Sequence, residues 1–207
     1  MRKTKEEAEK TREDLLKAAA LVFSDKGVAR ATLAEIAKAA GVTRGAIYWH
    51  FESKADIFDA LHERMHRPFM DAILEGLENE HSNPVEQLCD LWVKLFCDLG
   101  EDEQRKQGLI LFMGKTDYSG DLAIYKDKHF KKHEESMQLF RSYFQKMKKA
   151  GKLPLELDHD LILEGMFCFM KGILLEYLDK PESFDLNNKI PQLIHWFFNH
   201  MGLTVNE

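Results

Sequence analysis

The sequence predicts an all-α fold. Leucine occurs 26 times and valine and isoleucine together 16 times, whereas β-strands favour β-branched residues. No stretch keeps the alternation of apolar and polar residues that marks a half-buried strand, and apolar residues recur at helical spacing instead. Glycine and proline separate the helical stretches. We expect about nine helices, arranged as an N-terminal three-helix domain followed by a larger helical domain.

The first two helices have clear ends. Apolar residues between positions 15 and 23 share one face of the first helix, which ends at Gly27, a residue that readily takes the left-handed conformation of a helix C-cap. Thr32 and Glu35 have the spacing of a capping box, in which each side chain accepts a hydrogen bond from a backbone N–H group. The second helix therefore begins after Thr32, and Gly41 ends it.

The third helix is predicted to be short. Thr43 can cap a helix over residues 44–51, in which Ile47 and Phe51 are four positions apart and can both face the core. Ser53 and Asp56 give another capping signal, which starts a long fourth helix.

Five more helices follow at greater length. Their predicted ranges are 84–99, 101–113, 122–150, 158–178 and 186–201. Pro191 either lies in the first turn of the last helix or kinks it, and the sequence leaves both open.

The charge of the chain is unevenly divided. The formal net charge over 207 residues is −6, which taken alone disfavours nucleic acid as a partner. Residues 1–54 carry 11 Lys and Arg against 8 Asp and Glu, a net charge of +3, so the remainder carries −9. This asymmetry indicates that the N-terminal end meets an anion. Chance variation on a solvated surface is the alternative that charge alone leaves open.

Residues 32–54 carry the most informative pattern. They read TLAEIAKAAGVTRGAIYWHFESK, which is a helix, a short turn beginning with glycine, and a second short helix. This is the helix-turn-helix pattern, whose second helix enters the major groove with its N-terminal residues at the base edges. It predicts double-stranded DNA as a partner.

The residue types of the second helix suit that position. The planar guanidinium of Arg44 can pair with guanine O6 and N7. Thr43 can reach a base or a phosphate, and Gly45 lets the backbone approach closely. Exposed Tyr48 and Trp49 would mark a contact surface, unless both rings pack in the core of a small helical hairpin. The donors suited to phosphate oxygens are on Tyr48, His50 and Lys54.

Residues 11–58, with TREDLLKAAALVFSDKGVARATLAEIAKAAGVTRGAIYWHFESKADIF, closely resemble the N-terminal DNA-binding domain of the TetR family of bacterial repressors. GVTRGAIYWHF (residues 41–51) and PESFDL (residues 181–186) resemble the branch that represses multidrug efflux pumps of the resistance-nodulation-division type. The resemblance implies a homodimer on a palindromic operator, which a lipophilic small molecule releases. The residues it implies at the DNA are Thr32, Thr43, Arg44, Tyr48, His50 and Lys54.

The resemblance also implies a domain boundary and an effector pocket. Residues 1–54 would bind DNA and residues 55–207 would bind ligand and dimerise, with the fourth helix linking the two. Methionine and aromatic side chains together make an apolar cavity that repacks around varied lipophiles. The positions implied for the pocket are Met65, His66, Trp92, Leu95, Phe112, Met113, Phe140, Phe167 and Met170.

The last two helices carry more apolar surface than one inward face needs. We expect an antiparallel pair from each of two copies to form a four-helix interface, with a self-contained core as the alternative. The apolar positions concerned are Leu163, Met166, Ile173, Leu174, Leu193, Ile194, Trp196 and Phe197.

Two other functions compete with DNA binding. The H-E-x-x-H pattern of His62, Glu63 and His66 is that of a zinc protease, but no third ligand and no strand to align a peptide are evident. A redox-sensing regulator is a second alternative, although no base flanks Cys89 or Cys168, and Cys97 adjoins Asp98.

The remaining patterns give no support to catalysis. No Ser-His-Asp order, phosphate loop or dinucleotide fingerprint is present, so we expect no enzyme activity, cofactor or metal. With no apolar run long enough to span a bilayer and no export segment, a cytoplasmic protein without a membrane partner is expected. His129 and His133, four apart among lysines, are interpreted as part of a solvated face.

Overall fold

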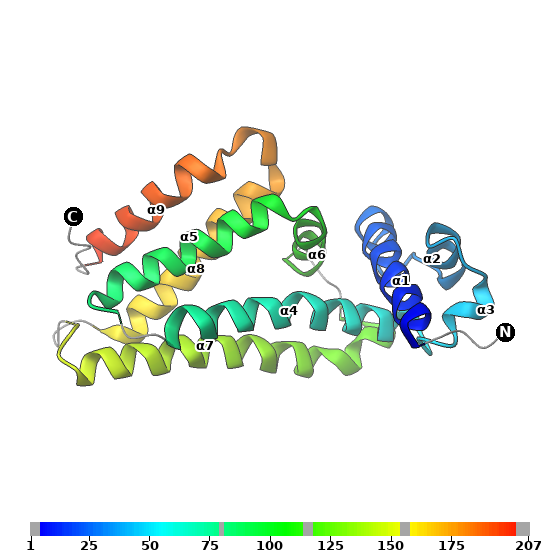
Figure 1. Cartoon of the computed structure of the whole chain (residues 1–207), viewed down its shortest axis with the longest axis horizontal. Coiled ribbons are helices and arrows are strands. Elements are labelled where there is room, and N and C mark those ends of the chain that lie inside the picture. The colour runs from blue at the N-terminus through cyan, green and yellow to red at the C-terminus, as the bar shows by residue number, and fades with distance from the viewer. Residues whose placement is uncertain (1–4, 79–80, 114–117, 154–157, 202–207) are drawn as a thin grey trace. The chain divides into compact units, whose positions relative to one another are not determined.

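The structure is a computed structural model that describes residues 5–78, 81–113, 118–153 and 158–201, and these residues are helical with no strand among them (Figure 1). The all-α prediction is confirmed. The helices are α1 (Lys5–Lys26), α2 (Leu33–Ala39), α3 (Arg44–Ile47), α4 (Lys54–Glu78), α5 (Pro84–Glu101), α6 (Glu103–Met113), α7 (Lys126–Lys149), α8 (His159–Asp179) and α9 (Leu186–His200), with the 3₁₀ turns η1 (Gly120–Tyr125) and η2 (Pro181–Ser183).

The described chain packs as two compact units. The first contains the residues up to 67 together with residues 103–129, and the second contains residues 68–102 and those from 130 onward. Helix α4 passes from one unit into the other. The boundary proposed after Lys54 concerns function rather than packing, and it stays a prediction.

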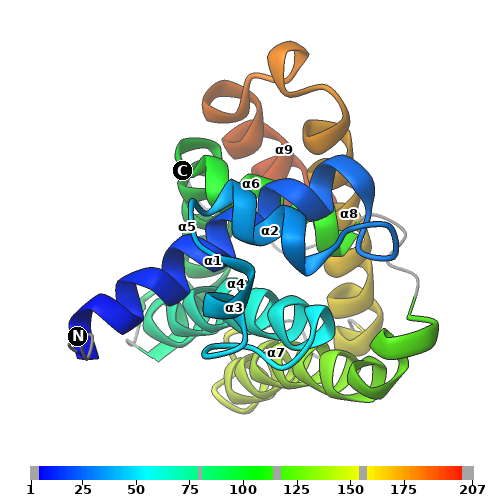
Figure 2. The same ribbon diagram turned by 90° about the vertical axis from the view of Figure 1, so that its right-hand side faces the viewer.

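The first unit is built around the helix-turn-helix. Helix α1 packs against α2 and α6, and α2 packs against α3. Figure 2 shows α1, α2 and α3 on the side that faces the viewer. The side chains of Phe23, Ile36, Ile47 and Phe58 are fully buried in one core. Burial of the two residues expected to anchor the third helix, Ile47 and Phe51, is confirmed.

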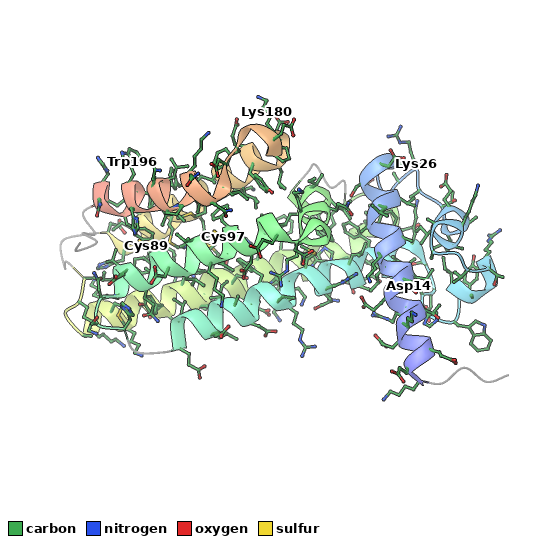
Figure 3. All side chains as sticks on the ribbon, turned by 45° about the horizontal axis from the view of Figure 1, so that its top comes forward. Asp14, Lys26, Cys89, Cys97, Lys180 and Trp196 are labelled. Carbon is green, nitrogen blue, oxygen red and sulfur yellow. The ribbon has the colours of Figure 1, made fainter. Side chains whose placement is uncertain are left out.

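The predicted caps of the first helices are confirmed. Gly27 and Gly41 have φ values of +75° and +68°, so each takes the left-handed conformation that favours glycine. Thr32 Oγ1 accepts from the Glu35 N–H at 3.2 Å, and Glu35 Oε2 accepts from the Thr32 N–H at 3.0 Å. Lys26 Nζ, at the end of α1 (Figure 3), donates to Glu35 Oε1 at 2.6 Å.

This capping box should make stability depend on pH. The hydrogen bonds from Lys26 and then Thr32 lower the pKa of Glu35 from 4.5 to about 2. Because the folded pKa is depressed, the stabilisation is complete above pH 4.5 and is lost as the pH falls toward 2. In chemical denaturation, the stability difference between the wild type and Glu35→Gln should shrink across that range. A difference independent of pH would contradict the prediction, and Glu164→Gln, at an exposed position, is the control.

The third helix is shorter than predicted. It ends at Ile47 rather than Phe51, and residues 48–50 form a turn. The Ile47 carbonyl accepts from both the His50 and the Phe51 N–H groups at 2.9 Å. Because both N–H groups bond to the same carbonyl, the backbone turns sharply after Ile47. The turn places Phe51 in the core, and α4 begins three residues later, after Ser53. The Ser53 and Asp56 cap is confirmed, since each side chain accepts from the other's N–H group.

The helix predicted over residues 122–150 begins later, at Lys126. Gly120–Tyr125 form the 3₁₀ turn η1, which two contacts hold in place: Leu122 is buried in the first unit's core, and the Tyr125 hydroxyl donates to Asp56 Oδ1 at 2.6 Å. In the last helix, Pro191 lies inside α9 and not in its first turn.

The second unit has its own core. Helix α5 packs against α9, and the Asn83 side chain caps the start of α5. Gln87 is buried and donates to the Gly76 carbonyl at 2.7 Å, while the Tyr143 hydroxyl donates to Gln87 Oε1 at 2.6 Å. These bonds join α4, α5 and α7 within the unit.

Candidate nucleic-acid interface and effector site

The surface of α3 presents the side chains expected at DNA. Thr43 caps the helix by accepting from the Ala46 N–H at 3.3 Å, which leaves Thr43, Arg44 and Gly45 exposed at its N-terminus. Tyr48 is 51% exposed and Trp49 is 88% exposed, while Ile47 beside them is fully buried. The expectation that both rings face outward is confirmed, and core packing of the pair is excluded.

The remaining predicted DNA contacts are more constrained. Lys54 Nζ donates to the carbonyls of Ala29 and Ala31, at 2.7 and 3.3 Å, so it holds the loop between α1 and α2. His50 is half-buried, with its ring 6.5 Å from that of Phe51. Thr32 is exposed at the start of α2. Phosphate contacts by these three residues stay predictions.

Three of the residues implied for the effector pocket form an aromatic cluster in the second unit. Trp92 of α5 stacks on Phe140 of α7 with centroids 5.4 Å apart, and the Phe167 ring of α8 stands edge-on to both, at 5.8 and 5.2 Å. Met170 is buried and Leu95 half-buried in the same unit. Their lining of a pocket stays a prediction.

Other residues implied for that pocket lie in the first unit. Met65 is half-buried and packs against Gly108 of α6, where a β-carbon would lie 2.5 Å from the Met65 sulfur. His66 stacks on His62 with centroids 6.0 Å apart, and His62 stands edge-on to Phe112 at 5.0 Å. The side chain of Met113 lies outside the described residues.

The interpretation of His129 as part of a solvated face is wrong, since its side chain is buried in the first unit. Its ring lies parallel to that of His62, with centroids 3.6 Å apart. Nε2 is 3.1 Å from Asp59 Oδ1 and Nδ1 is 2.9 Å from the Tyr118 hydroxyl. A neutral imidazole protonated on Nε2 donates to Asp59 and accepts from Tyr118, which satisfies both nitrogens. His133 is exposed, as expected.

This burial should make acid destabilise the folded protein. Loss of hydration lowers the pKa of His129 below its ordinary value of 6.5, although the neighbouring Asp59 acts in the opposite direction. Below pH 6.5 the unfolded chain therefore takes up a proton that the folded chain resists, and stability falls as the pH drops toward the folded pKa. NMR titration of the imidazole should report a pKa under 6.5. A value at or above 6.5 would refute the prediction.

The geometry does not support the zinc hydrolase. The described residues contain no group of three or more His, Cys, Asp or Glu arranged to hold a metal.

Cys89 and Cys97 are poor redox sensors. Burial raises the pKa of Cys89 to about 12, and burial followed by Asp98 raises that of Cys97; both lie on α5 (Figure 3). The reactive thiolate is therefore disfavoured at both positions.

The apolar positions noted on the last two helices differ in exposure. Five are buried in the core of their own unit, as the inward face of the pair requires; these are Leu163, Met166, Ile173, Ile194 and Phe197. Leu174 and Leu193 are half-buried. Trp196 of α9, labelled in Figure 3, is 54% exposed as expected. Leu161 and Leu175 of α8 are also exposed, and the sequence pattern had not singled them out.

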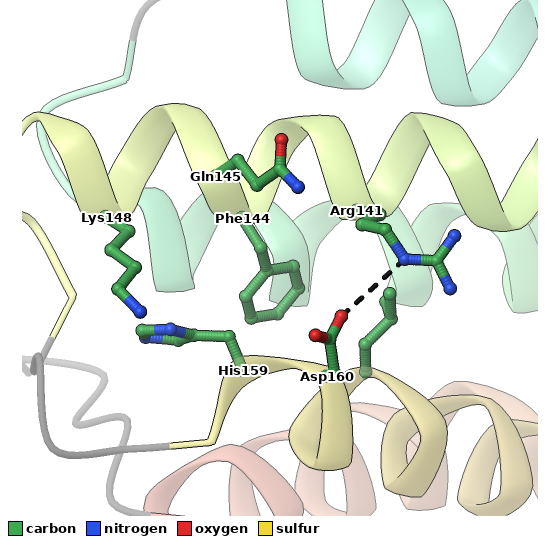
Figure 4. Close-up of a pocket in the computed structure, with 7 residues that line it drawn as sticks. Arg141, Phe144, Gln145, Lys148, His159 and Asp160 are labelled. Carbon is green, nitrogen blue, oxygen red and sulfur yellow. Dashed lines mark ion pairs between the residues drawn. The ribbon is translucent and has the colours of Figure 1, made fainter.

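A small hollow lies between α7 and α8 (Figure 4). It has a volume of about 160 Å³, below the 300 to 1,000 Å³ common for drug-sized ligands. Figure 4 shows Lys148 extending toward His159, while Arg141 pairs with Asp160 at 3.6 Å. The effector site predicted from the sequence does not include these residues.

A helix-turn-helix with an exposed second helix, followed by a helical unit with an aromatic core, defines a DNA-binding regulator with a separate sensing part. Residues 15–61 match the model of bacterial regulatory proteins of the tetR family, and residues 83–202 match the C-terminal region of MAATS-type transcriptional repressors. The chain belongs to the TetR family, whose members are transcriptional regulators. No described helix is long and apolar enough to cross a membrane.

Several known proteins are similar over nearly the whole chain. The HTH-type transcriptional repressor BepR of Brucella suis biovar 1 (strain 1330) is 34% identical, over 90% of this chain and 89% of that protein. The crystal structure of NalD, the secondary repressor of the MexAB-OprM multidrug efflux pump in Pseudomonas aeruginosa, is 27% identical with a TM-score of 0.82, covering 98% of this chain and 100% of that one. The SmeT-triclosan complex is 28% identical with a TM-score of 0.76, covering 92% and 91%.

Proposed function

We propose that the protein is a repressor of a multidrug efflux pump operon, which binds a palindromic operator as a homodimer and is released by lipophilic small molecules. The exposed side chains of Arg44 on α3 and of Tyr48 and Trp49 on the turn that follows it carry this proposal. Similarity to NalD, a pump repressor, and to SmeT bound to triclosan supports it. The protein acts in the cytoplasm, where its DNA is, and has no enzyme activity.

Reading DNA requires two copies of this surface. Helix α3 has four residues, so one copy reaches only a few base edges, and dimers place two such helices one DNA turn apart. The exposed Leu161, Leu175 and Trp196 on α8 and α9 supply apolar surface for the contact between copies.

Helix α4 offers the route by which a ligand acts on DNA binding. Six residues separate its start from the end of α3, and it also carries Met65 and His66 in the same compact unit. A ligand that favours a different position of α4 would change the spacing of the two α3 helices. A coupling free energy of about 1 to 3 kcal/mol corresponds to a 5- to 150-fold loss of operator affinity.

An electrophoretic mobility shift with the intergenic DNA beside this gene tests the proposal. We expect a specific shift that competitor DNA does not remove, and release by lipophilic compounds such as triclosan or lipophilic cations. Absence of a specific shift would remove the DNA-binding role. A specific shift that no compound relieves would leave a repressor without the proposed effector response.

A further inference from the structure

The indole N–H group of Trp92 is a buried hydrogen-bond donor without an acceptor. Its side chain is 6% exposed, and its indole Nε1 is buried with no hydrogen-bond partner. The rings around it are those of Phe96, Phe140 and Phe167, with centroids 6.3, 5.4 and 5.8 Å from the indole. None of these side chains carries an acceptor, so the N–H group has lost its hydration without replacement.

Packing alone does not explain an indole at this position. Buried tryptophans usually find an acceptor for their N–H group, and leaving a buried donor unpaired is costly. The same unit satisfies other buried polar groups nearby, since the Tyr143 hydroxyl donates to Gln87 and Gln87 donates to the Gly76 carbonyl. A phenylalanine at position 92 would make comparable apolar contacts and would bury no unpaired donor.

We propose that the effector supplies the missing acceptor, so that Trp92 Nε1 binds an oxygen of a flat lipophilic ligand lying among these rings. The inference rests on the proposed function and narrows its ligand class. Effectors are lipophiles that carry a carbonyl, ether or phenolic oxygen, and pure hydrocarbons of the same shape bind poorly. Trp92 is thus a specificity-determining residue within an otherwise apolar site.

A matched pair of probes tests the inference in the full-length protein. 2-Acetylnaphthalene and 2-isopropenylnaphthalene have the same shape, but only the ketone has an acceptor oxygen. By titration calorimetry we expect the wild type to prefer the ketone about tenfold, as one hydrogen bond allows. The preference should vanish in Trp92→Phe. It should persist in Tyr143→Phe, which loses a buried hydroxyl outside the aromatic cluster.

NMR of the indole N–H groups gives a second measurement on the unmodified chain. The sequence has 3 tryptophans, and the signal lost in Trp92→Phe identifies Trp92. The ketone should shift this signal downfield and slow its exchange with solvent, while the hydrocarbon should not. Equal affinities for both probes, a Trp92 signal that the ketone leaves unchanged, or no binding of either probe would overturn the inference. A specific operator shift in those cases would leave the DNA-binding role standing.

Discussion

Replacing Phe58 by alanine is expected to lower the free energy of unfolding by about 3 to 5 kcal/mol, the cost of removing a fully buried aromatic ring. Phe58 of α4 is completely buried in the first unit. Its ring centroid lies 6.4 Å from that of Phe23 in α1 and 5.0 Å from that of Phe112 in α6. The Tyr118 and His129 rings are within 6.3 and 5.7 Å.

The Phe58 ring contacts both the core of the helix-turn-helix and His129, which stacks on His62. Phe58→Ala should therefore weaken DNA binding as well as stability. Chemical denaturation followed by circular dichroism measures the change. Phe130→Ala is the matched control, because that phenylalanine is exposed, and it should change stability by no more than about 0.5 kcal/mol. A loss below about 1 kcal/mol for Phe58→Ala would show that the core collapses around the cavity.

Local sequence patterns predicted the helix-turn-helix well because the interactions that shape it are local. The Thr32 and Glu35 capping box and the left-handed glycines at positions 27 and 41 involve neighbours within a few residues. Tyr48 and Trp49 are exposed on the turn that directly follows α3.

Local patterns could not predict contacts between residues that are distant in the sequence. The lysines around His129 in the sequence suggest an exposed side chain. The imidazole is instead buried, where it pairs with Asp59, a residue 70 positions earlier. Lys54 offers a flexible cation suited to phosphate, but the structure turns its ammonium onto the carbonyls of Ala29 and Ala31. Apolar spacing on α8 and α9 does not show whether a residue faces its own unit or a partner.

Replacing Arg44 by alanine is expected to relax discrimination at one base pair of each half-site by about 1 to 3 kcal/mol, while affinity for random DNA changes little. The guanidinium is exposed in the first turn of α3 and makes no ion pair with the residues that the structure describes. It is therefore free to reach a base edge. Binding titrations against an operator and its single-base variants measure the effect. Equal losses on operator and random DNA would count against base reading.

Lys54→Ala separates a phosphate contact from a supporting role. Either role predicts weaker binding to every sequence, because the loop that Lys54 holds leads directly into α2. A lysine that neutralises a phosphate also contributes to the salt dependence of binding, so its loss should reduce the slope of log K against log salt by about 1. An unchanged slope with lower affinity would assign Lys54 to the loop alone. Arg44→Ala in the same titrations supplies the contrast, since a base contact changes specificity far more than the salt slope.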